Sequence, residues 1–258
     1  FKPFDSRFEA LYVLINDRFK VRRVLSMKVK ISADSTCDLS PELVAKYDID
    51  ITPLSVILGE RTGLDGREIT PQDIYDYVAQ TKSLPKTSAV NTVEYRRVFQ
   101  HWLDQGYAVV HFCISSDFSS CYQNACDAAK DMENVYVVDS RNLSTGQGLL
   151  VLHGAELARQ GVDAARIQAR CTALAPRVEA SFVVDRIDYL YKGGRCNALS
   201  AFGANLLHIK PSIEVIDGRM EPGQKYRGHI GKVMLNYVEK RLAGRTDIDK
   251  HRIFITHT

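Results

Sequence analysis

From Lys28 onward, short apolar runs rich in β-branched residues alternate with segments in which apolar residues recur every three or four positions. Runs of the first kind are typical of buried strands, and segments of the second kind are typical of amphipathic helices. We therefore predict strands over residues 29–33, 108–114 and 135–138, each followed by a helix. Such alternation favours an α/β fold with a doubly wound parallel sheet.

Proline and polar residues mark the ends of these elements. Pro53 interrupts the apolar run 49–58, which indicates an edge strand or a bulge, because proline cannot donate to a central ladder. Four helix starts carry a cap residue together with a proline, an acidic residue or a glutamine shortly after it. These predicted starts are Ser40 with Pro41, Thr70 with Asp73, Asn91 with Glu94, and Ser144 with Gln147.

After about residue 173 the hydrophobic pattern changes, and its apolar runs predict antiparallel pairs of strands. The runs 209–216 and 220–226 flank Asp217-Gly218, a dipeptide typical of the two-residue turn of a β-hairpin. The remaining predicted elements are a strand over 180–185, a helix over 230–242 and a strand over 252–256. We therefore predict a second domain of the α+β class.

These patterns divide the chain into three parts. Residues 1–27 form an N-terminal extension of unclear role, with an isolated amphipathic helix ahead of the first clear strand. The α/β domain is predicted over residues 28–172, and the α+β domain over residues 173–258.

Composition and charge exclude several classes of protein. The 34 basic and 31 acidic residues leave a formal charge of +3 and are spread too evenly for a nucleic-acid-binding stripe. No apolar run approaches the roughly 18–20 residues of a membrane-spanning helix, and no segment has the apolar core of a secretory signal. The six cysteines form no Cys-x-x-Cys pair, so we expect reduced, mostly buried thiols in a cytoplasmic protein.

Hydroxyl side chains gather where the predicted strands end. The carboxyl ends of parallel strands face the crevice in which open α/β sheets usually bind their ligands. Hydroxyls and free N–H groups at helix starts suit an anion such as a carboxylate or a phosphate, although the same residues also serve as ordinary caps and turns. The clusters are Asp34-Ser35-Thr36, Ser115-Ser116 with Ser119-Ser120, Asp139-Ser140 and, in a loop after Pro85, Thr87-Ser88.

Other kinds of chemistry have weaker support. Ser119 and Cys121 are candidate nucleophiles, but the sequence has no Gly-x-Ser-x-Gly elbow. His111 lies inside an apolar strand, where a core histidine is expected. The segment Lys192-Gly193-Gly194-Arg195 lacks the spacing of a phosphate-binding loop. His257 has no carboxylate pair nearby, and we predict no metal site.

Seven short segments stand in a specific order along the chain. They are Asp34-Ser35-Thr36-Cys37-Asp38-Leu39, Pro53-Leu54-Ser55-Val56, Lys86-Thr87-Ser88, Ile114-Ser115-Ser116 through Ser119 to Tyr122-Gln123, Val137-Val138-Asp139-Ser140 with Ser144 and Gly146-Gln147-Gly148, Tyr189-Leu190 with Lys192-Gly193-Gly194-Arg195, and Lys210-Pro211. Each is weak alone, but the ordered set, over about residues 28–257, resembles the DegV family of bacterial fatty-acid-binding proteins.

The resemblance implies two domains that enclose a long-chain fatty acid, with its carboxylate at the domain junction and its acyl chain in an apolar tunnel. Carried over by position, the carboxylate ligands are Thr87, Ser88, Ser119 and Ser120. Secondary candidates are Ser116, Cys121 and Arg195. A buried carboxylate needs hydrogen-bond donors to offset its desolvation, which agrees with this hydroxyl set. The resemblance implies no catalytic residue, no metal and no cofactor other than the bound lipid.

Family members characterised as carriers present the fatty acid to a separate kinase that makes acyl phosphate. By resemblance, we expect this chain to be the carrier, with a fatty acid kinase subunit as the partner that holds ATP and magnesium. Nucleic acid is not an expected partner, and transient contact with a membrane surface stays open.

Two departures from the family pattern bear on the site. Ser119-Ser120-Cys121 stands where the family usually has Ser-Gly-Thr, which exchanges a hydroxyl for a thiol. The family's closing His-Thr/Ser-Gly-Pro-Gly segment, whose histidine is a ligand in relatives, has no counterpart before Thr258, so we expect an incomplete second domain.

Two other functions remain open at this point. An enzyme that acts on a small acyl or phosphorylated substrate through Ser119 or Cys121 would turn its substrate over without a kinase. A regulatory interaction module would carry no stoichiometric lipid.

Overall fold

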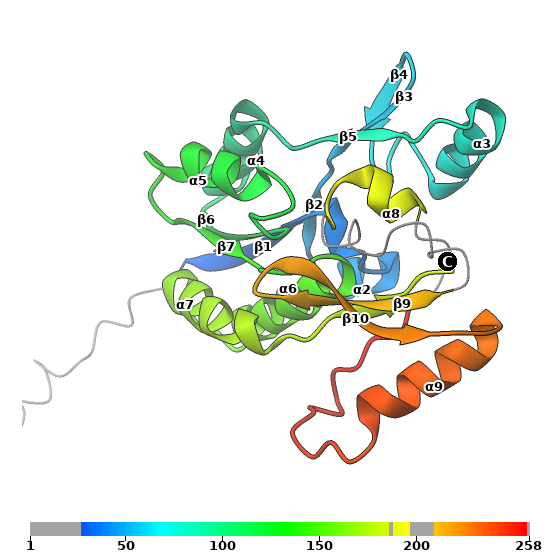
Figure 1. Ribbon diagram of the computed structural model, residues 1–258. Coiled ribbons are helices and arrows are strands. Elements are labelled where there is room, and N and C mark those ends of the chain that lie inside the picture. The colour runs from blue at the N-terminus through cyan, green and yellow to red at the C-terminus, as the bar shows by residue number, and fades with distance from the viewer. Residues whose placement is uncertain (1–26, 186–187, 197–208, 257–258) are drawn as a thin grey trace, which may run out of the picture.

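The structure is a computed structural model that describes residues 27–185, 188–196 and 209–256, so the predicted N-terminal helix and His257 lie outside the described residues. Its centre is a parallel sheet in the strand order β2-β1-β6-β7 (Figure 1). The strands are β1 (Lys28–Asp34), β2 (Asp50–Thr52), β6 (Tyr107–Cys113) and β7 (Val135–Asp139). This sheet confirms the predicted α/β class.

Helices cover both faces of the parallel sheet (Figure 1). One face packs against α4 (Thr92–Asp104) and α5 (Cys121–Ala129), and the other against α2 (Pro41–Tyr47), α6 (Ser144–Arg159) and α7 (Ala164–Leu174). Six of the seven residues of β6 are buried, as expected for a strand covered on both faces. A Cβ on Gly154 of α6 would meet Phe112 of β6 at 2.5 Å, so glycine permits this close approach.

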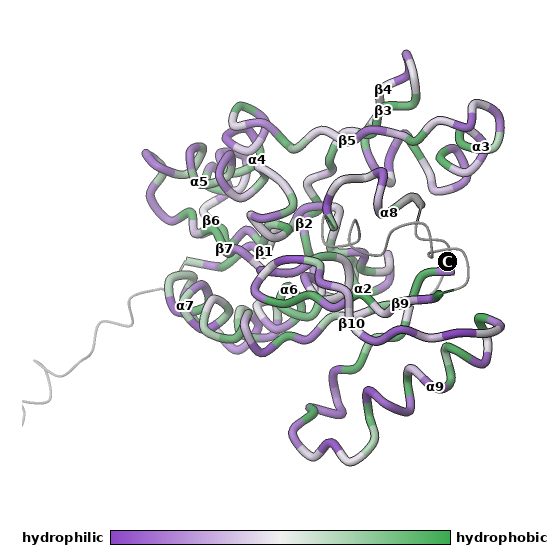
Figure 2. Tube along the Cα trace, in the orientation of Figure 1, coloured by the Kyte–Doolittle hydropathy of each residue, from purple (hydrophilic) through white to green (hydrophobic). Residues whose placement is uncertain are grey.

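Two antiparallel sheets complete the fold. One has the order β4-β3-β5 and packs against α3; the other, which we call the hairpin sheet, has the order β10-β9-β8 and packs against α9. Figure 2 shows hydrophobic and hydrophilic residues alternating along α9. The bounds are β3 (Ser55–Leu58), β4 (Arg61–Leu64), α3 (Pro71–Thr81), β5 (Lys86–Ser88), β8 (Ser181–Val183), α8 (Asp188–Gly193), β9 (Lys210–Ile216), β10 (Arg219–Tyr226) and α9 (Ile230–Leu242), with 3-10 turns at η1 (Ser35–Cys37) and η2 (Ala175–Arg177). None of the described helices combines the length and apolar character needed to cross a lipid bilayer.

Three of the four predicted helix caps are confirmed, each accepting a backbone N–H three residues further on: Ser40, Thr70 and Asn91. The cap predicted at Ser144 is wrong, because Leu143 is the N-cap and Ser144 is the first helical residue, at a φ of +50°. Gln147 is buried, and its side chain binds other elements of the fold. Its amide oxygen accepts from the Thr36 hydroxyl at 2.9 Å, and its amide nitrogen donates to the Phe112 carbonyl at 3.1 Å. Gln147 therefore ties α6 to β6 and to the end of β1.

The predicted hairpin is confirmed in β9 and β10. Its turn residues Asp217 and Gly218 have φ values of +48° and +82°, the left-handed conformations of a type I′ turn. The run 49–58 forms two strands in different sheets, separated by Pro53, and β2 is an edge strand as predicted.

Two further predictions of local structure are wrong. Thr87-Ser88 lie in the short strand β5 rather than in a loop, because this segment pairs with β3, which is distant in the sequence. The segment 252–256 contains no strand; Phe254 packs against the core of the parallel sheet instead, and Arg252 pairs with Glu156 of α6. The predicted boundary near residue 173 stays a prediction.

The buried carboxylate of Asp34 joins β1, β6 and α4. It accepts hydrogen bonds from the Tyr95 hydroxyl at 2.6 Å, from the backbone N–H of Ile114 at 3.0 Å and from His111 Nε2 at 3.1 Å. The other ring nitrogen, His111 Nδ1, lies 2.8 Å from the Ser32 hydroxyl. A carboxylate inside a protein persists only with such donors, so His111 has the core role expected of it.

We predict that Asp34→Ala lowers the free energy of unfolding by about 3–5 kcal/mol, because three buried donors lose their common acceptor. Urea denaturation of the purified variant measures this loss. The control is Asp76→Ala on the exposed face of α3, for which we expect a change within about 0.5 kcal/mol. Equal effects of the two substitutions would contradict the role assigned to Asp34.

Candidate functional site

Polar loops meet at the carboxyl edge of the parallel sheet, where β1, β2, β6 and β7 end. Ser35, the first residue after β1, donates to Asp65 at 2.6 Å and accepts the backbone N–H of Leu54 at 3.2 Å. These two bonds hold the start of β3 against the end of β1. Ligands of open α/β sheets usually bind at this edge.

Thr87 and Ser88 reach the same edge through β5. In the pairing of β3 with β5, Val56 is opposite Thr87 and Ser55 is opposite Ser88. Ser55 directly follows Leu54, which Ser35 holds, so Ser88 is placed close to the end of β1. Both hydroxyl-bearing residues are exposed, and the described hydrogen bond of Ser88 is a long one of 3.4 Å to the Ala89 carbonyl.

A contact between the segment after β5 and the first turn of α5 brings the two predicted hydroxyl pairs to one corner. The Asn124 amide donates to the Val90 carbonyl at 2.8 Å. Val90 lies two residues after Ser88, and Asn124 lies one helical turn after Ser120. The Thr87-Ser88 and Ser119-Ser120 segments are therefore neighbours in the structure; we call this region the hydroxyl corner.

At the start of α5, Ser119 and Ser120 have different environments. Ser120 is the N-cap residue, but its exposed hydroxyl makes no capping bond. Ser119 is half-buried; its Oγ accepts the backbone N–H of Cys121 and donates to Cys121 Sγ, both at 3.2 Å. The hydroxyl of Ser120 and the start of the helix thus face outward, where an anion is favoured by the helix dipole.

The thiol of Cys121 is buried and neutral. Burial is the largest cause that raises its pKa, and the charge of Asp34 adds to it, while Ser119, Tyr95 and the backbone of Val90 lower it less. A catalytic cysteine requires the opposite shift, toward the thiolate. His111 is committed to Asp34 and Ser32, so it cannot act as a base for this thiol.

An apolar cluster joins the hydroxyl corner to the hairpin sheet. Its buried members come from the loop after β6, the segment after α8, and both hairpin strands; they are Phe118, Cys196, Ile213 and Met220, with Ile114, Phe182 and Leu190 packed around them. Phe118 directly precedes Ser119, so apolar surface and hydroxyl groups adjoin. Arg195 precedes Cys196, but it is exposed, and its described hydrogen bond goes to the Gly193 carbonyl at 2.7 Å.

Ser116 belongs to a different group of contacts, in which Arg141 and Asp117 hold the turn between β9 and β10. We call this group the Arg141 clasp. Ser116 Oγ accepts from Arg141 Nη1 at 3.2 Å, and the same nitrogen donates to Asp117 at 2.6 Å. Arg141 also donates to the Asp217 carbonyl, and Arg219 donates to Asp117 at 2.8 Å. The Ser116 hydroxyl is therefore engaged by Arg141, which sequence reasoning missed because the partners of Arg141 are remote along the chain.

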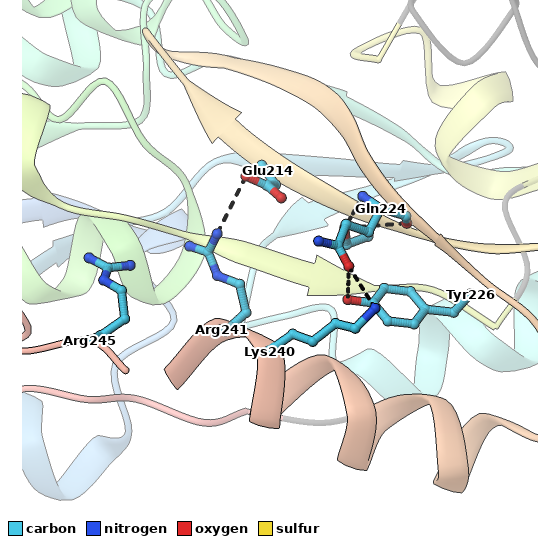
Figure 3. Close-up of a pocket in the computed structure, with 7 residues that line it drawn as sticks. Glu214, Gln224, Tyr226, Lys240, Arg241 and Arg245 are labelled. Carbon is cyan, nitrogen blue, oxygen red and sulfur yellow. Dashed lines mark hydrogen bonds and ion pairs between the residues drawn. The ribbon is translucent and has the colours of Figure 1, made fainter. Parts of the chain in front are cut away.

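The described cavities lie away from this corner. One of about 140 Å³ lies between the hairpin sheet and α9 (Figure 3). Its arginines, Arg241 and Arg245, are paired with Glu179 and Glu214. Lys240 donates to the neutral amide of Gln224. The other, of about 310 Å³, lies between α6, Tyr47 and residues 251–254. Neither is lined by a predicted carboxylate ligand.

One group of three metal-ligating side chains occurs among the described residues: Asp34, His111 and Cys113. All three are buried, and both ring nitrogens of His111 are already hydrogen-bonded. Burial raises the pKa of the Cys113 thiol, which disfavours the thiolate that binds metals. The geometry is that of a hydrogen-bonded core network.

The sheet order places this chain among α/β proteins in which a parallel sheet is accompanied by antiparallel sheets. A sequence model described as an uncharacterised protein of the DegV family matches residues 28–258, so the chain belongs to the DegV family. A DegV domain-containing protein of Clostridium perfringens is 34% identical over 203 residues, which cover 78% of this chain and 73% of that protein.

Solved structures with the same fold include lipid-binding proteins. A fatty-acid-binding DegV family protein from Thermus thermophilus superposes with a TM-score of 0.76 at 30% identity, covering 85% of this chain and 79% of that one. A stearic-acid-binding protein from Eubacterium ventriosum superposes with a TM-score of 0.71 at 31% identity, covering 83% of this chain and 78% of that one. The resemblance found in the sequence is confirmed.

We predict that Gly218→Ala disrupts the Arg141 clasp and lowers the free energy of unfolding. Gly218 has a φ of +82°, and a Cβ there would meet the Arg141 guanidinium carbon at 2.5 Å and Ser115 Oγ at 2.7 Å. The matched control is Gly244→Ala, because Gly244 has a φ of +70° and a Cβ added there would have no atom within 4 Å.

Thermal or urea unfolding separates the two effects. We expect a loss of about 1 kcal/mol for Gly244→Ala from backbone strain alone, and about 1–3 kcal/mol more for Gly218→Ala. Equal losses would show that the clasp makes no contribution.

Proposed function

We propose that this protein binds a long-chain fatty acid, with the carboxylate held at the hydroxyl corner by Thr87, Ser88, Ser119 and Ser120. The observation that carries the proposal is the junction of that corner with the apolar cluster around Phe118. The acyl chain would lie along the apolar side, toward the hairpin sheet. Cys121 and Arg195 are secondary candidates, and Ser116 is bound to Arg141.

The proposed site can stabilise both the carboxylate and the acyl chain of this ligand. Hydroxyl donors and the N-terminus of α5 offset the desolvation of a carboxylate. For the chain, roughly 0.8 kcal/mol per buried methylene gives on the order of 10 kcal/mol for about 16 carbons, before the costs of association. Solved DegV proteins of the same fold, described as binding fatty acids, supply independent support.

We further propose that the protein is a non-catalytic, cytoplasmic carrier that presents the fatty acid to a fatty acid kinase, which holds ATP and magnesium. The environment of Cys121 supports the absence of nucleophilic chemistry, because its thiol is buried and its pKa is raised. Ser119 has Cys121 as its described hydrogen-bond partner, and no histidine, so the enzyme alternative has no activated nucleophile among the described residues.

We predict that the double substitution Ser88→Ala with Ser119→Ala weakens fatty acid binding by about 3 kcal/mol, on the order of a hundredfold, because the carboxylate loses two donors. Titration of delipidated protein with hexadecanoate measures the dissociation constant. Ser83→Ala, at an exposed serine before β5, is the control and should leave the constant unchanged. Unchanged affinity in the double variant would remove these residues from the site.

A second prediction addresses catalysis. The purified protein, given hexadecanoate, ATP and magnesium, should form no acyl phosphate and consume no ATP over hours. Adding a fatty acid kinase subunit should start turnover. Sustained turnover by the protein alone would defeat the carrier function.

A further inference from the structure

The thiol of Cys121 lies directly behind Ser119 at the hydroxyl corner. Ser119 Oγ donates to Cys121 Sγ at 3.2 Å. Cys121 is buried, so this bond runs from the edge of the corner into the core. The nearby Tyr95 hydroxyl donates to Asp34 at 2.6 Å.

The direction of the Ser119 proton follows from its two bonds. A hydroxyl has a single proton, and the proton of Ser119 is donated to the Cys121 sulfur. The oxygen of Ser119 accepts the backbone N–H of Cys121. The proton of the Ser119 hydroxyl therefore points inward, away from a carboxylate at the corner.

A ligand carboxylate can be bound by Ser119 only if this proton turns outward. Sulfur is a weak acceptor, so the Ser119–Cys121 bond is easily exchanged for a charge-assisted bond to a carboxylate. The backbone N–H of Cys121 continues to hold the Ser119 oxygen in place at 3.2 Å. A hydroxyl at position 121 would accept more strongly and would hold the proton inward.

We propose, building on the fatty acid function proposed above, that Cys121 is a positioning residue that holds the Ser119 hydroxyl proton in the free protein and releases it to the carboxylate when the ligand binds. In this role Cys121 acts through Ser119 and not as a ligand of the carboxylate, in place of its secondary candidacy above. The residue at position 121 thus tunes affinity through the strength of one hydrogen bond.

The test compares Cys121→Ser and Cys121→Ala by titrating delipidated protein with hexadecanoate. Cys121→Ser should weaken binding by about three- to tenfold, because the hydroxyl competes for the Ser119 proton. Cys121→Ala removes the acceptor, so it should bind as tightly as the unsubstituted protein or up to about threefold more tightly. A merely structural role would weaken binding in both variants.

A double-mutant cycle with Ser119→Ala separates the remaining outcomes. In that background, both Cys121 substitutions should leave the dissociation constant unchanged within about twofold, because no Ser119 proton remains to be held. Equal effects with and without Ser119 would overturn the inference and leave the proposed function intact. Unchanged affinity on Ser119→Ala alone would overturn it together with the assignment of Ser119, and absence of binding by the unsubstituted protein would overturn the proposed function itself.

Discussion

The carboxyl group of Asp34 is enclosed by the protein, and its need for hydrogen-bond partners organises the elements around it. The hydroxyl of Tyr95, the ring of His111 and the backbone N–H of Ile114 supply those partners from α4, from β6 and from the loop that follows β6. Because these bonds are lost if any element shifts, they fix where β6 ends and where the serine-rich loop begins. The position of Ser119 therefore depends on the hydrogen bonds of a carboxyl group that lies behind it in the core.

Two further contacts determine what the corner faces. The Asn124 amide bound to Val90 draws the segment after β5 toward α5, which makes neighbours of hydroxyl groups about thirty residues apart in the sequence. The Arg141 clasp fixes the hairpin turn on the loop that carries Ser116, so the apolar cluster around Phe118 can form beside the corner. Polar and apolar surfaces that adjoin in this way suit a ligand with an acidic end and a long apolar chain.

Much of the fold could be predicted from local pattern, because local physics controls those features. The Asp217-Gly218 turn, the cap at Thr70 and the buried strand β6 each follow from residues within a few positions of one another. Prediction failed where partners that are distant in the sequence determine the local structure. The side chain of Gln147 binds Thr36 and Phe112 and not the start of its own helix, and β5 forms by pairing with β3. The candidate ligands came from the resemblance to relatives. The network of Tyr95, Asp34 and His111 could not be predicted, since it joins residues from separate elements across the core.

Binding of an apolar chain with a carboxylate end at the hydroxyl corner can be measured on the protein as purified from bacterial cells. Mass spectrometry of an organic extract, calibrated against the protein concentration, measures how much fatty acid accompanies each chain. We expect one long-chain fatty acid per protein molecule, and less in a protein that carries both Ser88→Ala and Ser119→Ala. An extract without stoichiometric fatty acid, from protein that also fails to take up added hexadecanoate, would contradict it.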